Sequence, residues 1–224
     1  MSKKQPVLFL VMVILAGLAL LTMGCQATTY QYKGNLLNPP QPVPDFELMA
    51  TDGRSFHLSD LEGKVALVFF GYTNCPDVCP LTVAKVQQTL TNLDQAERER
   101  VKFIFISTDP ERDTPEVLAR YLSNFNSEFI GLTDDFEKTQ TVMKAYWAYA
   151  EKAELLEPTA GQVEASHDHA ETTTSQAEAR PTYLVQHTAR VYLVTPQREL
   201  LLMYPSEFEA EDLRSELIYL FKQM

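Results

Sequence analysis

The feature that most constrains the fold of this chain is an alternation between short, continuous apolar runs and stretches with helical spacing. Residues 65–70 read Val-Ala-Leu-Val-Phe-Phe, and residues 101–107 form a second run of this kind. Runs that are this short and rich in β-branched and aromatic residues are typical of strands buried on both faces. Because stretches with helical spacing follow them, the pattern predicts an α/β domain with a largely parallel central sheet and helices on both faces.

Weaker signals complete this predicted domain. The turn dipeptide Asp52-Gly53 separates two strand-like segments, 46–48 and 55–58, and predicts an N-terminal hairpin. The last strands are expected to add antiparallel edges to the sheet. One expected helix ends at residue 92, and the others span 114–126, 135–150 and 208–221. The other expected strands are 129–132, 182–186 running into 189–194, and 199–204.

The first 24 residues are predicted to be an export signal. Two lysines precede an uncharged apolar run over residues 7–21, which matches the charged and apolar regions of such signals. The run is short for a membrane-spanning helix, which needs about 20 apolar residues. Gly24-Cys25 after it resembles a bacterial lipoprotein cleavage site and predicts lipidation at Cys25, with an uncleaved N-terminal anchor as the alternative. Either anchor would hold the body outside the cytoplasm, on a membrane of the cell envelope.

One segment of unusual composition precedes the domain, and another interrupts it. Residues 25–44 are expected to be a tether, because four of the seven residues 38–44 are prolines and such segments favour extended polyproline II. The folded domain is therefore expected over residues 45–224. Residues 151–180 are rich in Glu, Ala, Thr, Ser and Gln. They lack the apolar groups that offset the entropy of ordering, which predicts a mobile insertion.

Charge and cysteine content narrow the function classes. The formal net charge is −11, and an acidic body repels phosphate backbones, which argues against nucleic-acid binding. No G-x-G-x-x-G or P-loop pattern indicates a nucleotide cofactor. The chain has three cysteines, too few for a disulfide scaffold. With Cys25 assigned to processing, Cys75 and Cys79 remain as a working pair.

Cys75 and Cys79 lie four residues apart, directly after the first apolar run. At the start of a helix this spacing places both sulfurs on one face. The helix N-terminus is then expected to lower the pKa of both thiols. Two close thiolates can close a disulfide or bind a soft metal ion. A purely structural disulfide would close a very short loop and gain little entropy, so redox chemistry or metal binding is favoured.

His187 lies between two apolar stretches at the end of an expected strand. A lone histidine in such a place is usually a satisfied polar group, but with Cys75 and Cys79 it completes a set of three ligands. Thiolates favour Cu(I), and imidazole accommodates Cu(II) as well. The same three ligands would also suit an open zinc site, and the spacing does not exclude that metal.

Three separated segments resemble the Sco/SenC family of copper chaperones. They are Phe70–Pro80 (FGYTNCPDVCP), Ser107–Pro115 (STDPERDTP) and the histidine strand that ends in Tyr192–Pro196 (YLVTP). The likeness covers roughly residues 43–222 apart from the insertion. One departure is Gln186, because the family pattern usually has Asp before the histidine. That substitution changes the charge expected beside His187, not the ligand set.

The resemblance implies a thioredoxin-like fold and a function in copper delivery. It implies that Cys75, Cys79 and His187 bind copper as Cu(I) and as Cu(II). It further implies that a copper donor protein loads the chain and that the CuA-bearing subunit of cytochrome c oxidase receives the metal. Reduction of the cysteines of that CuA centre is an additional role that the family resemblance brings.

Four other polar residues are weaker candidates. Asp77 lies between the cysteines and would either tune their thiolates or be a solvated loop residue. Asp109 opens a loop expected to face the site, although an Asp-Pro pair also forms ordinary turns. His167 and His169 flank an aspartate in the insertion and could capture copper transiently, although a disordered polar tract is the default for that composition.

Two other functions compete with copper delivery. An exported thiol–disulfide oxidoreductase, or a peroxidase-like protein without copper, would use Cys75 and Cys79 alone. Catalysts of the thioredoxin type have two residues between their cysteines, whereas this pair has three, and His187 would then have no role. An inert envelope domain would leave the cysteine segment without a function. Copper binding is therefore the leading prediction.

Overall fold

A computed structural model describes residues 30–154 and 183–224 of the chain. Cys25 and the expected export signal lie outside the described residues, and so do His167 and His169. No helix in the described ranges is both long and apolar enough to cross a bilayer.

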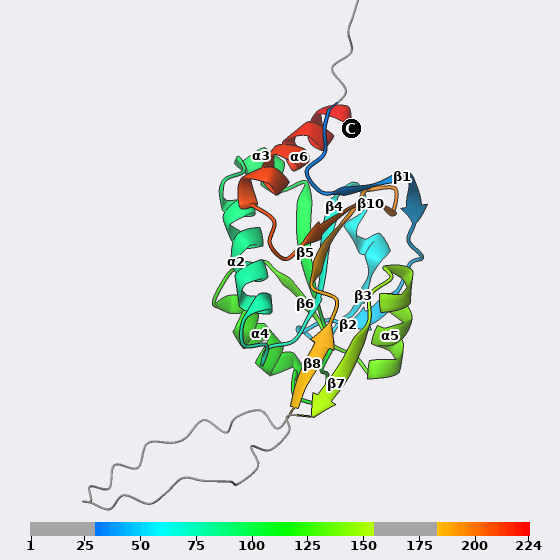
Figure 1. Cartoon of the computed structure of the whole chain (residues 1–224), viewed down its shortest axis with the longest axis vertical. Coiled ribbons are helices and arrows are strands. Elements are labelled where there is room, and N and C mark those ends of the chain that lie inside the picture. The colour runs from blue at the N-terminus through cyan, green and yellow to red at the C-terminus, as the bar shows by residue number, and fades with distance from the viewer. Residues whose placement is uncertain (1–29, 155–182) are drawn as a thin grey trace, which may run out of the picture. The chain divides into compact units, whose positions relative to one another are not determined.

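A six-stranded sheet runs through the domain in the order β1-β10-β9-β4-β5-β6 (Figure 1). The three strands β4, β5 and β6 are parallel, whereas β9, β10 and β1 continue the sheet with antiparallel pairing. The α/β prediction with parallel central strands and antiparallel edge strands is therefore confirmed. The strands are β1 (Asn35–Pro42), β4 (Val65–Gly71), β5 (Val101–Ser107), β6 (Ile130–Leu132), β9 (Arg190–Val194) and β10 (Glu199–Pro205).

Strand β4 is buried along its whole length because helices or loops cover both faces of the sheet. Successive side chains of a strand point to opposite faces. Leu67 and Phe69 accordingly join one core cluster with α2, α4 and α6. Val68 and Phe70 join the other, with α5 and the hairpin of β2 (Glu47–Met49) and β3 (Ser55–His57). The helices are α2 (Val78–Thr91), α3 (Gln95–Arg98), α4 (Pro115–Ser123), α5 (Phe136–Ala145) and α6 (Ala210–Gln223), and a 3-10 helix, η1, spans Leu58–Leu61. Figure 1 shows these two layers on either side of the sheet.

Two short antiparallel pairs lie apart from the central sheet. The predicted N-terminal hairpin is confirmed as β2 (Glu47–Met49) and β3 (Ser55–His57), which pair with each other. The second pair is β7 (Ala150–Glu154) with β8 (Tyr183–His187). This second pair differs from the prediction, because the expected strand continuous through 182–194 is split. Its first part, β8, pairs with β7, and only β9 enters the central sheet.

The predicted end of the tether, at residue 44, is wrong. Residues 35–42 form β1 and pair antiparallel with β10, so the domain begins before residue 45. Proline lacks a backbone N–H and is tolerated in sheets only at edges or bulges. Strand β1 is the edge strand, and its pairing shifts register between Leu36 and Gln41, which accommodates the prolines.

The helix expected to reach about residue 150 ends at Ala145. Trp147 follows with a φ of 51°, a left-handed conformation that is strained for a bulky residue. The chain then forms β7, so residues 151–154 are part of a strand and not of a mobile insertion. Pairing with β8, more than 28 residues further along the chain, could not be inferred from the local composition.

Candidate metal centre

The candidate site lies where β4 ends and α2 begins, at the carboxyl end of the parallel strands. Helix α2 starts at Val78, so Cys79 is in its first turn as expected. Strand β4 ends at Gly71, where the close approach of other groups requires glycine. A Cβ atom at Gly71 would lie 2.7 Å from the Phe69 ring and 3.0 Å from the Cys79 sulfur. Glycine therefore lets Cys79 pack directly beneath the end of the strand.

The buried carboxylate of Asp113 holds the segment between β4 and α2 in place. It accepts hydrogen bonds from the Thr73 amide at 3.0 Å, from the Thr73 hydroxyl at 2.6 Å and from the Ser107 hydroxyl at 2.7 Å. Burial raises the pKa of Asp113, although these hydrogen bonds oppose the shift. Because Ser107 ends β5, the contacts tie the cysteine loop to the neighbouring strand.

Both site cysteines are free thiols in this structure, and both are buried. Cys79 is completely inaccessible, whereas Cys75 retains 8% of its surface. The backbone amide of Cys79 points at the Cys75 sulfur, 3.4 Å away. Cys75 is therefore the more accessible sulfur, and it accepts a hydrogen bond from the first turn of α2.

The two thiols differ in acidity. The hydrogen bond from the Cys79 side chain lowers the pKa of Cys75 to about 4, helped by His187 and by the backbone amides of Asp77 and Cys79, against the opposing effect of burial. Burial raises the pKa of Cys79, and the adjacent Cys75 raises it further. The expectation that the pKa of both thiols is lowered is therefore wrong for Cys79, because its position beneath the loop removes it from solvent.

His187 ends β8 and brings a third ligand atom to the cysteines. Its Nε2 atom lies 3.4 Å from the Cys79 sulfur. Its ring meets the Tyr72 ring edge-on, with centroids 5.6 Å apart, and also contacts Phe69. The ligand atoms of Cys75, Cys79 and His187 all lie within 4.8 Å of one another, the only such group of three found in residues 30–154 and 183–224.

This spacing suits a metal ion. Metal–sulfur bonds of about 2.3 Å, the length that zinc makes, place two ligands roughly 4 Å apart. The donor set of two thiols and one imidazole therefore needs only small movements to close around an ion. The Nδ1 atom of His187 is buried and has no hydrogen-bond partner among the described residues. A metal-binding histidine usually has a partner on its second nitrogen, and Gln186, which is exposed, does not supply one.

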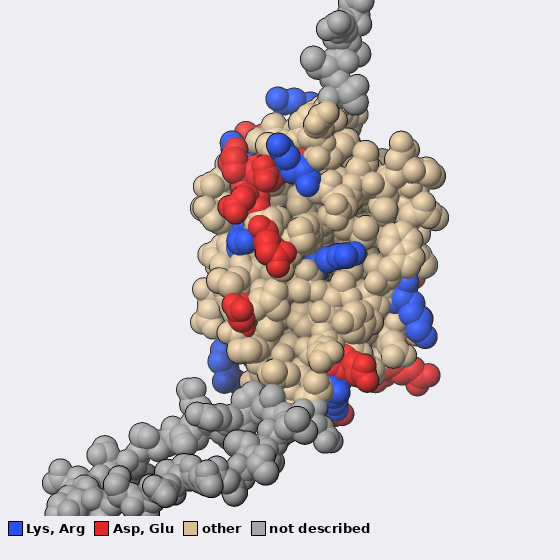
Figure 2. Space-filling view, viewed as in Figure 1, with Lys and Arg blue, Asp and Glu red and all other residues tan. Residues whose placement is uncertain are grey.

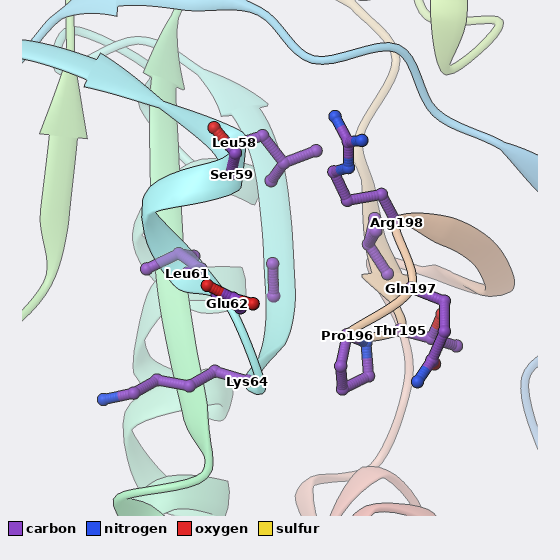
Figure 3. A pocket seen from close by; sticks show the side chains of 11 residues that line it. Leu58, Ser59, Leu61, Glu62, Lys64, Thr195, Pro196, Gln197 and Arg198 are labelled. Atoms are coloured by element: carbon purple, nitrogen blue, oxygen red, sulfur yellow. The ribbon is translucent and has the colours of Figure 1, made fainter.

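Cys75 and His187 open onto a shallow cleft of about 450 Å³. The exposed ring of Tyr149 lines its rim, together with Val78 and Leu184. A second hollow of about 350 Å³ lies between η1 and the turn joining β9 to β10 (Figure 3). It is lined by residues such as Glu62 and Arg198 and contains neither cysteine nor histidine. The first cleft is therefore the candidate route for a metal.

The two aspartates named as weaker candidates take different places. Asp77 is exposed and precedes α2, and it touches the site through its backbone amide, which hydrogen bonds to Cys75. Asp109 is fully buried and pairs with Arg112. It also accepts a hydrogen bond of 2.8 Å from the Tyr183 hydroxyl. Asp109 therefore contacts the β7–β8 pair, and among the described residues no hydrogen bond joins it to the cysteines.

Sequence reasoning did not single out Tyr72, Arg112, Asp113 or Tyr183. Tyr72 and the pair Arg112-Asp113 lie inside the segments that carry the family resemblance, so they could have been found there as polar or aromatic residues without a role. Tyr183 offered no such signal, because Asp109 and Arg112, which hydrogen bond to it, lie more than 70 residues away. On the face drawn in Figure 2, basic side chains lie singly, whereas several acidic side chains gather together.

Comparisons with known proteins bear on this site. A family model described as SCO1/SenC matches residues 36–222. Protein SCO2, mitochondrial, from Saccharomyces cerevisiae is 31% identical over 156 residues, which cover 70% of this chain and 45% of that protein. The chain spans about half the length of the curated relatives it matches.

Solved structures agree in fold. The solution structure of apo Sco1 from Thermus thermophilus is 31% identical, with a TM-score of 0.68, and the match covers 87% of this chain and 99% of that one. The structure of Bradyrhizobium japonicum ScoI with copper bound is 29% identical, with a TM-score of 0.62, and the match covers 80% of this chain and 98% of that one.

Proposed function

The chain belongs to the SCO1/SenC family, and from this premise we propose that it is a metallochaperone that binds copper and delivers it to the CuA centre of cytochrome c oxidase. The family prediction made from three sequence segments is confirmed, and so is the thioredoxin-like fold. The observation that carries the proposed function is the meeting of Cys75, Cys79 and His187 within 4.8 Å.

Each ligand has a distinct role in the proposal. Thiolates are soft ligands that favour Cu(I), and two of them suffice because Cu(I) accepts low coordination. The imidazole of His187 adds the nitrogen ligand that Cu(II) prefers. Copper is the cargo, so it must also leave. Cys75, the more accessible sulfur, would be the ligand that a receiving protein replaces first.

Zinc is the competing metal for this ligand set. Three protein ligands and an open fourth position would suit it. Two observations favour copper: two of the three ligands are thiols, and structures of the ScoI proteins of Bradyrhizobium japonicum and Arabidopsis thaliana have copper bound. Metal analysis of the reduced protein after exposure to equimolar copper and zinc would decide between them.

Thiol–disulfide exchange is a second candidate function, favoured by the low pKa of Cys75. The Cys75 thiolate would attack a disulfide in a partner and form a mixed disulfide, releasing one partner thiolate. Cys79, on losing its proton, would then attack Cys75 and release the second. The partner disulfide would be reduced to two thiols, and Cys75 and Cys79 would be oxidised to a disulfide. Reduction of the CuA cysteines before copper delivery is the form of this reaction that we propose.

The location of the protein is a further part of the proposal. Residues 1–24 would direct export, and lipidation at Cys25 would anchor the domain to a membrane of the cell envelope. The sequence Gly24-Cys25 after an apolar run supports this. Labelling with a palmitate analogue in cells should then mark the wild type and not Cys25→Ser. Labelling of both would remove Cys25 as the lipidation site.

Copper transfer in vitro tests the proposed function directly. The reduced, copper-loaded protein is mixed with the metal-free CuA domain of a cytochrome c oxidase, and the absorption of the CuA centre is followed. We expect the wild type to form the centre and Cys75→Ser, loaded with the same amount of copper, to fail. A wild type that binds no copper under reducing conditions would overturn the proposal.

A further inference from the structure

The placement of His187 depends on a pair of strands that stands apart from the central sheet. Strands β7 and β8 pair only with each other among the described residues. One end of β8 continues into β9 three residues after His187. Among the described residues, the other end, at Tyr183, has no sheet partner except β7, and side chains hold its position.

Three residues supply that support. The Arg112 guanidinium lies 3.7 Å from the centroid of the Tyr183 ring, and its Nη1 atom donates to the Tyr183 carbonyl oxygen at 3.0 Å. Asp109 pairs with the Nε atom of Arg112 and accepts from the Tyr183 hydroxyl at 2.8 Å. The three side chains thus contact one another in a closed triangle. Planar stacking and several donors in fixed directions are properties of arginine that lysine lacks.

The same loop also holds the other strand of the pair. Lys152 of β7 forms an ion pair of 2.6 Å with Glu111, and its amine lies 5.0 Å from the Tyr183 ring centroid. Arg112 reaches the site from a second direction. It lies 5.8 Å from the Tyr72 ring centroid, and Tyr72 is the ring that meets His187 edge-on. Arg112 therefore touches both the strand and the ring that place the imidazole.

We propose that Asp109, Arg112 and Tyr183 are positioning residues that hold His187 beside the cysteines and thereby set the preference of the site between Cu(II) and Cu(I). The inference rests on the proposed function. Cu(II) needs the imidazole, whereas two thiolates can hold Cu(I) without it. Loosening the triangle should therefore weaken Cu(II) binding selectively.

A role in stability alone explains the triangle less well. Asp109 is completely buried, and Arg112 keeps only 20% of its side-chain surface. Burying an ion pair costs desolvation energy that the attraction between the charges does not reliably repay. Such a pair is better suited to fixing one arrangement of the chain, here the arrangement that brings His187 to the metal.

Arg112→Lys and Tyr183→Phe test the inference, with Arg214→Lys as the matched control. Arg214 also pairs with an acidic residue three positions earlier, Glu211, and donates to a distant carbonyl, that of Asn92. Asn92 follows the last turn of α2, at the opposite end of that helix from Cys79. We expect Arg112→Lys to lower the affinity for Cu(II) about tenfold and that for Cu(I) less than about threefold, with Arg214→Lys changing neither.

Two further measurements separate positioning from a general loss of structure. In the metal-free protein, hydrogen exchange of the β8 amides should be faster in Arg112→Lys than in Arg214→Lys, because the support of that strand is reduced. In a His187→Ala background, Arg112→Lys should have no further effect on Cu(II) affinity, because the positioned group is gone.

Opposite results would overturn the inference. Unchanged β8 exchange together with unchanged Cu(II) affinity would show that the triangle does not hold His187. An equal loss of Cu(I) and Cu(II) affinity would show that the triangle supports the whole site and not His187 in particular. A full effect of Arg112→Lys in the His187→Ala background would show the same. A wild type without copper affinity would instead remove the proposed function, and the exchange of β8 in the metal-free protein would still decide whether the triangle supports the strand.

Discussion

The Nε2 atom of His187 lies 3.4 Å from the Sγ atom of Cys79, although 108 residues separate them in the sequence. Cys79 is the inaccessible sulfur, and Cys75 is the acidic one that faces the cleft. The three ligands therefore differ in access. An ion bound by all three would have Cys79 on its buried side and Cys75 and His187 toward the cleft.

Replacing His187 by alanine should weaken Cu(II) binding more than Cu(I) binding. The two thiolates that remain suit Cu(I), whereas Cu(II) loses the nitrogen ligand it prefers. We expect the Cu(II) affinity to fall at least about tenfold, or ~1.4 kcal/mol, while the Cys75–Cys79 disulfide still forms. Titration of both oxidation states, with disulfide formation assayed alongside, measures this. His57→Ala is the control, because His57 lies on β3 outside the group of three ligands. Unchanged Cu(II) affinity and spectrum in His187→Ala would remove His187 from the site.

Oxidation of the cysteine pair should abolish Cu(I) binding. A disulfide has no thiolate to offer, so oxidation and metal binding exclude each other. We expect one Cu(I) per reduced chain and none per fully oxidised chain, and copper should protect both cysteines from oxidants. Equilibrium dialysis of the two redox forms measures the stoichiometry. Stoichiometric Cu(I) on the oxidised protein, with the disulfide intact, would contradict the prediction.

The reactivity of Cys75 should persist in mild acid. An ordinary cysteine thiol has a pKa of about 8.5, whereas the pKa of Cys75 is lowered to about 4. The thiolate is the reactive form, so alkylation of the reduced, metal-free protein should stay nearly constant from neutral pH down to about 5 and fall as the pH approaches 4. The site of modification is read by mass spectrometry.

The neighbouring thiol provides the control for this pH profile. Its hydrogen bond is the largest cause of the shift in Cys75, so Cys79→Ala should move the alkylation curve to higher pH. His57→Ala should leave the curve where it is. A wild-type curve centred near pH 8 would show that the loop does not stabilise the Cys75 thiolate.

Local sequence patterns were sufficient to predict the core of the fold and the cysteine pair. Strand β4 is a continuous apolar run, and the segment from Gly71 to Cys79 follows it without interruption, so strand, loop and helix start could be read in order. Long-range placement could not be read in this way. The raised pKa of Cys79 results from burial beneath Gly71 and the loop, which depends on the packed structure.

The contacts around the β7–β8 pair show the same limit. Arg112 meets Tyr183 across 71 residues, a separation that no periodicity encodes. Local composition was misleading at β1, because a run with prolines at 39 and 40 is typical of a spacer. Pairing with β10 makes it an edge strand, and edge strands tolerate proline.

The inclusion of β1 leads to the last prediction: a chain that begins at Tyr32 should be considerably more stable than one that begins at Asp45. The shorter chain loses β1 and exposes β10 as an unpaired edge. It also loses the backbone amides of Lys33 and Gly34, which donate to Oε1 of the buried Glu216. An unsatisfied buried carboxylate costs about 1–3 kcal/mol, and the edge pairing adds to this.

We expect urea denaturation to give an unfolding free energy lower by at least about 2 kcal/mol for the shorter chain. A third chain, which begins at Tyr32 and carries Glu216→Gln, retains β1. Its unfolding free energy should therefore lie closer to that of the unsubstituted chain beginning at Tyr32 than to that of the chain beginning at Asp45. Equal stability of the chains beginning at Tyr32 and Asp45 would show that residues 32–44 do not stabilise the folded domain and belong to the tether.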